Sequence, residues 1–291
     1  MRNRNALGWM LTTPYLFFTG IFFSYPFVWS FILLFHKGSI VSRKMEFVGL
    51  SNLQKALQSP KVLAAFMFTY KFMLIFIPAV VLSSLFIALL INSLKRGKTF
   101  FSLGFFLPYV SSGVAMSIIV RGLLSWTSPL SGAIRFVFGR TPDWFGEPFL
   151  AVLIIALMVA WKHSGYYALI FLAGLQSIPK EYYEVAKIDG AKPLTRLWNI
   201  TIPMLYPAFS TILILAVGVS FQIFAEPLML TGGGPHYATH TWQLEIYFQA
   251  FEFGNLGYGT TIAVFDAVVT FLTVLVFKRI MQIWGKKYGW I

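Results

Sequence analysis

The sequence has no cysteine and few charged residues. Charged side chains make up 11% of the 291 residues, against roughly 25% in an average soluble domain. The missing cysteines exclude disulfide bonds, thiolate metal sites and a cysteine nucleophile. The low charge argues against a water-soluble fold.

Hydrophobic residues make up 57% of the chain, and they gather in runs of about 20 residues or more, long enough to cross a hydrocarbon core as helices. The runs lack the apolar–polar alternation of barrel strands and are about twice as long as such strands. The sequence therefore predicts an all-α membrane protein. We expect six transmembrane helices, in the segments Gly8 to Phe35, Val62 to Ile91, Phe100 to Trp126, Phe149 to Leu175, Met204 to Leu230 and Thr260 to Phe277.

The net charge of +13 comes from Lys and Arg residues scattered between the apolar runs, without the long basic tract that would indicate nucleic-acid binding. The positive-inside rule places basic connections in the cytoplasm. Basic residues also fall on the opposite side, Lys37 and Arg135 among them, so the bias is modest. If successive helices alternate in direction, both termini are cytoplasmic and four basic clusters share that side: Arg2 and Arg4, Lys95 to Lys98, Lys180 to Arg196, and Lys278 to Lys287.

The stretch from Leu175 to Pro207 separates the fourth and fifth apolar runs and is too polar to cross a bilayer. Ser177 to Glu181 offers the cap residue and the proline that are typical of a helix start. The charged residues that follow continue this helix, and Gly190 ends it. A second short helix after Pro193 precedes the next apolar run. The stretch predicts a helix-turn-helix elbow on the cytoplasmic face, suited to fit a cleft on another protein.

The spacing within this elbow resembles the cytoplasmic signature of permease subunits of ABC importers. That signature is Glu-Ala-Ala, three residues, Gly, nine residues, then Ile-x-Leu-Pro. The chain has Glu184 to Ala186, Gly190 and Ile200 to Pro203 at the same spacing, with conservative departures at Val185 and Ile202. EFVGLSNLQKAL, FFLPYVSSGVA and LTGGGPHYATHT are similar to the first permease subunit of the carbohydrate-uptake branch (maltose, glycerol-phosphate and multiple-sugar type), so the resemblance covers nearly the whole chain.

The resemblance implies the fold of a type I ABC importer permease, as one transmembrane domain over residues 1–291 with a coupling loop at about 176–203. It implies a bacterial or archaeal cell membrane and its lipid. The implied partners are a second permease subunit, two ATP-binding subunits and an extracellular solute-binding protein. The substrate would be a sugar, of di- or oligosaccharide size and neutral or acidic. ATP and magnesium would bind the partner ATPase, and this chain would carry no cofactor, metal or catalytic residue.

The elbow would act as the coupling helix, seated in a groove of the ATPase. Glu184 would make polar contacts at that joint, and Gly190 would permit the tight turn, since glycine reaches positive φ at little cost. Val185 is expected to pack the turn. The alternative for Glu184 and Asp189 is a solvated helix face. The coupling residues that the resemblance implies are Glu181, Glu184, Ala186, Asp189, Gly190, Ile200 and Pro203.

A sugar site needs aromatic faces together with groups that donate and accept hydrogen bonds. The fourth and fifth apolar runs hold such residues, and the maltose-type resemblance implies that these runs line the sugar pocket. Tyr166 can equally fill the core of the bundle. His163, His236 and His240 are a weak metal candidate because they are far apart in the sequence. The substrate-lining candidates are Lys162, His163, Tyr166, Ser220, Gln222 and Glu226.

A second class of function remains open. Charged groups near the centre of a bilayer cost about 2.5 to 3.5 kcal/mol, so Lys71 and Asp266 call for a partner or a role. With the histidines, they could serve an ion-coupled membrane carrier or a membrane-embedded enzyme. Co-purification with an ATPase subunit would distinguish these alternatives from an ABC permease.

Overall fold

The computed structural model describes residues 2–38, 45–287 and 289–290. The described part is mostly helical, with one pair of short strands. The chain divides into two compact units, the first comprising residues up to Leu63 together with Glu245–Val268, and the second comprising Ala64–Leu244 and Val269–Ile291. The single permease domain expected over residues 1–291 stays a prediction.

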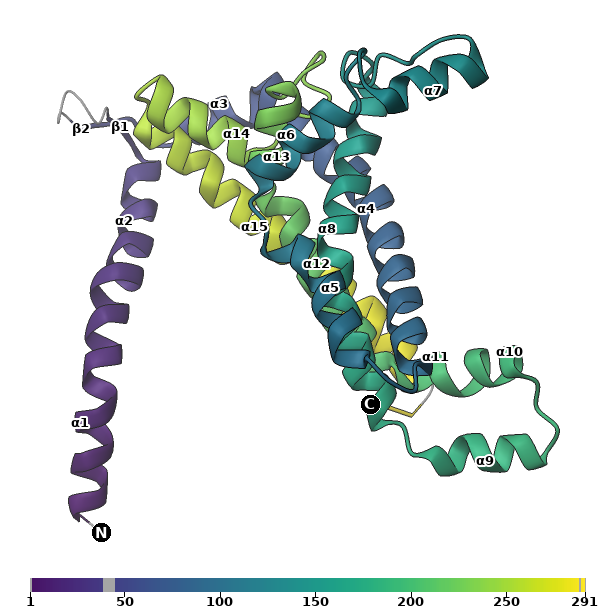
Figure 1. The fold of residues 1–291 in the computed structure, drawn as a ribbon. Coiled ribbons are helices and arrows are strands. Elements are labelled where there is room, and N and C mark those ends of the chain that lie inside the picture. Colours follow the sequence, from purple (N-terminus) through teal and green to yellow (C-terminus); the bar gives the residue numbers. More distant parts are fainter. Residues whose placement is uncertain (1, 39–44, 288, 291) are drawn as a thin grey trace. The chain divides into compact units, whose positions relative to one another are not determined.

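The first unit begins with a long apolar rod. Helices α1 (Arg2–Thr19) and α2 (Tyr25–Leu34) are joined by a π-helical turn at Gly20–Ser24 (Figure 1). Most of the large apolar side chains from Trp9 to Phe35 are exposed. Exposed apolar side chains on a helix of this length suit contact with lipid tails.

A small hairpin and a short helix follow this rod. Strand β1 (His36–Gly38) pairs antiparallel with β2 (Met45–Phe47), and α3 (Ser51–Gln58) comes next. Asn52 on α3 is buried, and its Nδ2 donates to the carbonyl oxygens of Leu34 at 3.1 Å and His36 at 3.0 Å. One side chain thus bonds both the last carbonyl of α2, which has no helical partner, and the first carbonyl of β1.

The second unit holds a bundle of helices (Figure 1). Helices α4, α14 and α15 each run from one unit into the other, and a π-helical stretch, Phe248–Glu252, follows α14. The helices outside the elbow are α4 (Pro60–Ser93), α5 (Lys98–Val110), α6 (Gly113–Leu123), α7 (Pro129–Phe138), α8 (Pro148–Ser177), α12 (Tyr206–Gln222), α13 (Ala225–Thr231), α14 (Trp242–Tyr247) and α15 (Leu256–Lys287).

The membrane-spanning pattern agrees with the six predicted segments. Within the described residues, four helices are long and apolar enough to cross a membrane: Gly8–Leu34, Pro60–Ser93, Pro148–Ser177 and Leu256–Lys287. Two bent helix pairs raise the number to six if each pair is one span. The predicted all-helical membrane fold is therefore confirmed, with corrections to the third and fifth segments.

The third span, predicted from Phe100 to Trp126, is sharply bent. Helices α5 and α6 meet at 93°. The carbonyl of Pro108 accepts hydrogen bonds from both the backbone nitrogen of Ser111, at 3.3 Å, and its hydroxyl, at 2.6 Å. Ser112 is extended, with φ −62° and ψ 135°. The serine hydroxyl gives the backbone a local alternative to the helical ladder, and the helix ends there.

The fifth span, predicted from Met204 to Leu230, is also broken. Helix α12 ends at Gln222, Ile223 is extended, and α13 begins at Ala225. Pro227 accounts for the break, because a proline ring clashes with the carbonyl four residues earlier in a continuous helix. Here that carbonyl belongs to Ile223.

Helices α5 and α8 approach closely at Gly165. A Cβ atom at this position would overlap the backbone carbonyl oxygen of Phe105 on α5. Small residues let membrane helices bring their backbones together, and van der Waals packing then holds them in place of a hydrophobic driving force. Gly165 therefore sets the spacing of this helix pair.

We expect Gly165→Ala to lower the free energy of unfolding by about 1–3 kcal/mol, the usual cost of overpacking. The measurement is the thermal midpoint of the purified protein in detergent. Gly218→Ala is the matched control, since a Cβ at Gly218 on α12 meets nothing within 4 Å. Equal midpoints for the two variants would contradict the close approach.

Candidate functional site

The polar stretch between α8 and α12 forms the predicted elbow. It consists of α9 (Lys180–Ile188), α10 (Pro193–Arg196), a π-helical stretch (Leu197–Thr201) and α11 (Ile202–Met204). The segment that contains α10 and α11 meets α12 at 65°. Figure 1 shows α9 and α10 projecting from one end of the second unit, with α7 at its opposite end.

The start of the elbow differs from the prediction. Helix α8 continues to Ser177, whose hydroxyl donates to the carbonyl of Gly174 at 2.8 Å. Ser177 therefore does not cap α9, and the N-cap position is taken by Pro179, which is extended. The predicted cap is wrong because α8 keeps its buried apolar face up to its last turn, where Leu175 and Ile178 are buried.

The turn after α9 has the hydrogen bonds of a Schellman motif. The backbone nitrogen of Gly190 donates to the carbonyl of Lys187 at 3.1 Å, and that of Ala191 donates to the carbonyl of Ala186 at 2.8 Å. Gly190 has a φ of +75°, a conformation that costs side chains with a Cβ energy. Gly190 ends the helix as predicted.

Helix α9 has one attached side and one exposed side. On the attached side the hydroxyl of Tyr183 lies 2.9 Å from the hydroxyl of Thr201, which is buried. The opposite side exposes four residues that lie within about 100° of arc at 100° per residue. We call this set the elbow face: Glu181, Glu184, Val185 and Ile188.

The elbow face mixes carboxylates with apolar groups. Val185 is 58% exposed and Ile188 is 85% exposed. The expectation that Val185 packs the turn is therefore wrong, because its side chain points away from the elbow's own contacts. Among the remaining predicted coupling residues, Asp189 is exposed, Ala186 and Ile200 are half-buried, and Pro203 is buried.

A residue beyond the C-terminal end of α15 contacts the elbow's exit, where the chain passes from Pro203 into α12. The indole nitrogen of Trp290 donates to the carbonyl of Pro203 at 3.0 Å. The Trp290 ring also stacks on Tyr206, with ring centres 6.1 Å apart. The sequence did not predict this contact of Trp290. The one signal for it was a large aromatic residue within the polar segment that follows Lys286.

Two substrate-lining candidates form an ion pair. Nζ of Lys162 on α8 lies 3.2 Å from Oε1 of Glu226 on α13, and their side chains are 14% and 9% exposed. Gly113, the first residue of α6, adjoins the same carboxylate, since a Cβ there would lie 2.6 Å from Oε1 of Glu226. Three helices therefore meet at this pair.

Two further candidates belong to an aromatic cluster. Tyr166 stacks on Tyr109, with ring centres 4.5 Å apart, and His163 contacts the edge of Tyr109. One ring nitrogen of His163 lies 2.9 Å from the carbonyl of Val159. Sequence reasoning missed Tyr109, although FFLPYVSS places it beside a proline and two serines. The cluster packs α5 against α8.

The last two candidates differ in exposure. Ser220 is buried, and its hydroxyl donates to the carbonyl of Ala216 at 2.8 Å. Gln222, the last residue of α12, is exposed. Of these two residues, only Gln222 is exposed. Among the described residues, no group of three or more His, Asp or Glu side chains could hold a metal ion.

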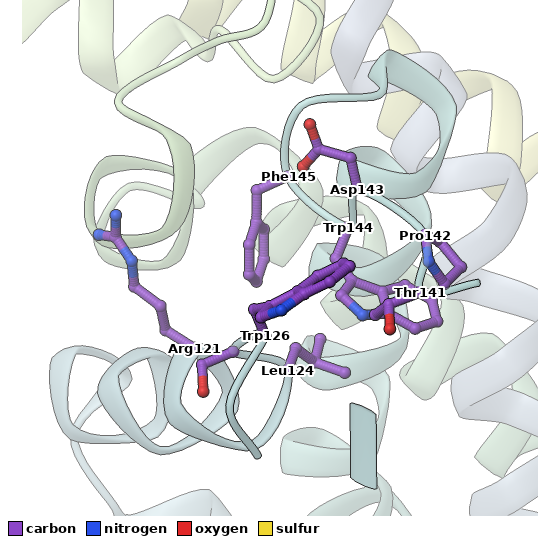
Figure 2. Close-up of a pocket in the computed structure, with 9 residues that line it drawn as sticks. Arg121, Leu124, Trp126, Thr141, Pro142, Asp143, Trp144 and Phe145 are labelled. Atoms are coloured by element: carbon purple, nitrogen blue, oxygen red, sulfur yellow. The ribbon is translucent and has the colours of Figure 1, made fainter. Parts of the chain in front are cut away.

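A pocket of about 470 Å³ lies where α6 ends and where the connection from α7 to α8 passes. Figure 2 shows the rings of Trp126 and Phe145 near each other, with Arg121 directed away from them. The guanidinium of Arg121 donates to the carbonyl of Met229 on α13 at 3.2 Å. Asp143 is also fixed, because its Oδ1 accepts from the backbone nitrogen of Gly146 at 2.9 Å. The sequence did not predict this pocket.

Comparisons with known proteins agree with this geometry. A family model described as binding-protein-dependent transport system inner membrane component matches residues 55–288. The multiple sugar-binding transport system permease protein MsmF of Streptococcus mutans is 29% identical over 272 residues, which cover 93% of this chain and 94% of that protein. The lactose transport system permease protein LacF of Rhizobium radiobacter is 30% identical over 284 residues, which cover 96% and 94%.

A solved structure shares the fold. One chain of a bacterial ABC transporter involved in the import of the acidic polysaccharide alginate superposes with a TM-score of 0.82 at 21% identity, covering 96% of both chains. The match confirms the predicted fold class, that of an ABC importer permease. The sequence matches confirm the predicted resemblance to carbohydrate-uptake permeases.

We expect Tyr183→Phe to loosen the elbow, because it removes a hydrogen bond worth about 0.5–1.5 kcal/mol. Trypsin cleavage after Lys187 should become about 2- to 10-fold faster, since cleavage follows the population of the open form. Tyr182→Phe is the control, because Tyr182 is 54% exposed and its hydroxyl makes no hydrogen bond within the described residues. Identical cleavage of both variants would argue against the attachment.

Proposed function

Because the chain belongs to the family of binding-protein-dependent transport system inner membrane components, we propose that it is one permease subunit of an ATP-driven importer of di- or oligosaccharides. The family makes it a multi-pass membrane protein and a transport component, not an enzyme, as the sequence predicted. The sugar substrate is supported by the relatives named as multiple sugar and lactose permeases.

The observation that carries this proposal is the exposed elbow face. Exposed apolar side chains such as Val185 and Ile188 mark sites of protein contact when they lie outside the bilayer. Glu181 and Glu184 beside them add charge complementarity, which gives a contact its specificity and register. In this proposal the elbow face sits in a groove of an ATP-binding subunit.

The elbow is built to transmit movement. Its turn is closed by the hydrogen bonds around Gly190, its helix is attached through Tyr183 and Thr201, and its exit is held by Trp290. A push on the elbow face therefore displaces the elbow as one body. The adjoining ends of α8 and α12 would follow, because the elbow is continuous with both helices.

The proposal places the elbow end in the cytoplasm. The basic residues Lys95 and Arg96 lie between α4 and α5, and Lys98 begins α5, at the elbow end of the second unit (Figure 1). Lys278 to Lys287 form the end of α15, which the Trp290 contact brings to the same place. Basic residues gather on the cytoplasmic side of membrane proteins. With six alternating spans, both chain termini lie there too.

The remaining partners follow from this orientation. Two ATP-binding subunits would hold ATP and magnesium beneath the membrane, and a second permease subunit would complete the path. An extracellular solute-binding protein would deliver the sugar at the end that carries the pocket around Trp126. The host is a bacterial or archaeal cell membrane, whose lipid surrounds the apolar helices.

Within the path, Gln222 and the pair of Lys162 and Glu226 are the residues best placed to meet a sugar. Gln222 is exposed at the break between α12 and α13, and Glu226 follows that break. His163 and Tyr166 stay predictions, since both take part in helix packing. Ser220 also stays a prediction, with its hydroxyl bonded within α12.

We expect Glu184→Lys to detach the ATP-binding subunits, because it places a cation on the elbow face where a carboxylate makes the contact. The measurement is the amount of ATPase subunit that co-purifies with the tagged permease, which should fall at least several-fold, together with ATP-dependent sugar uptake in proteoliposomes. Glu147→Lys is the control, with the same charge change at an exposed carboxylate before α8.

Undiminished co-purification and uptake in Glu184→Lys would overturn the coupling role. Uptake by this chain alone, without ATP, would instead favour an ion-coupled carrier.

A further inference from the structure

The ion pair between Lys162 and Glu226 removes two charges from water and cancels them. The two atoms are 3.2 Å apart, and the side chains are 14% and 9% exposed. A buried pair is held together by mutual attraction, and separation leaves an uncompensated charge in a poorly solvated place. At this point the interior of the second unit therefore carries no net charge.

The pair lies where two membrane spans are interrupted. Glu226 belongs to α13, which starts after the break at Ile223, and it adjoins Gly113, which starts α6 after the break at Ser112. Non-helical backbone at membrane depth is tolerated only where protein buries it or where it lines a water-filled cavity. Gln222, exposed beside the same break, is consistent with the second situation.

We propose that this pair makes the translocation path selective for uncharged saccharides and excludes acidic ones. The proposal rests on the proposed function and narrows its substrate class. Sugar hydroxyls both donate and accept, so they can bond to the carboxylate and the ammonium while the pair stays intact. An acidic sugar would have to take Lys162 from Glu226, and the abandoned carboxylate would repel it.

The relatives do not decide between uncharged and acidic saccharides. They include permeases named for multiple sugars and for lactose, and a solved transporter that imports an acidic polysaccharide. Lys162 is the residue that an acid would use, and it is already neutralised.

The test separates charge selection from simple bracing of the helices. Glu226→Gln keeps the shape of the side chain and leaves Lys162 without its counter-charge. The double variant Lys162→Gln/Glu226→Gln restores neutrality. Glu226→Asp keeps the charge but draws it back by one methylene, which provides a second partial variant if Glu226→Gln does not accumulate.

The assay uses the complete complex in proteoliposomes, with its binding protein, ATP and whichever of maltose, trehalose or lactose it carries. D-glucuronate and D-glucose are the matched competitors. We expect glucuronate to inhibit the wild type no more than glucose does. In Glu226→Gln, glucuronate should inhibit at a roughly 10-fold lower concentration than glucose, as one charge-assisted hydrogen bond allows. In the double variant, the ratio of the two inhibitory concentrations should return to the wild-type value. In Glu226→Asp, the ratio should lie between those of the wild type and Glu226→Gln.

Competition between the sugars for the binding protein is the same in every variant, so it does not affect the comparison between variants. A wild type that is inhibited more by glucuronate than the double variant is would overturn the proposal, because Lys162 would then serve acids. If the ratio of the inhibitory concentrations of glucuronate and glucose stayed at the wild-type value in both Glu226→Gln and Glu226→Asp, the proposal would be overturned. The pair would then serve only to hold the helices together. A failure of the proposed function looks different, since no variant and no wild type would then take up any of the three sugars.

Discussion

The bilayer offers no water to a broken helix, and this constraint governs the second unit. Helices that end at Val110 and Gln222 expose backbone groups that must be satisfied within the protein. The structure meets the demand by bringing the restarted helices α6 and α13 together around Glu226, which Lys162 neutralises. The close approach of α5 and α8 at Gly165 further stabilises the packing of these helices. In the proposed function these breaks belong to the path, because a transporter needs polar groups where a simple anchor needs none.

The same unit carries its second specialised region outside the apolar spans. The elbow is polar enough to leave the membrane, yet it is held by specific bonds at its turn, its helix and its exit. In the proposed function such a segment acts as a lever, because these bonds hold its two ends together. Its exposed face joins Glu184 to apolar neighbours such as Ile188, a combination that soluble partners recognise. A permease needs both regions. The region around Glu226 would contact the substrate, and the elbow would receive the movement of the ATP-binding subunit.

Much of this could be predicted from the sequence, because long apolar runs have few solutions in a bilayer. The positions of the spans and the elbow followed from hydropathy, and Gly190 from the need for positive φ. Hydropathy alone did not locate the breaks, because Pro227 and the serines after Pro108 act locally within runs that remain apolar on average. The pairing of Lys162 with Glu226, and the contact of Trp290 with Pro203, join residues distant in sequence. No local pattern predicts such contacts, since they depend on how helices pack.

The central claim is that the elbow face meets an ATP-binding subunit. The absence of native cysteine allows a direct measurement, with Ile188→Cys on the elbow face as the sole thiol and a maleimide–benzophenone reagent bound to it in the assembled complex. Illumination should join this chain to the ATP-binding subunit, whereas Trp126→Cys, at the other end of the second unit, should give no such product. Labelling of Ile188→Cys from outside intact cells, with no crosslink to the ATP-binding subunit, would contradict the account.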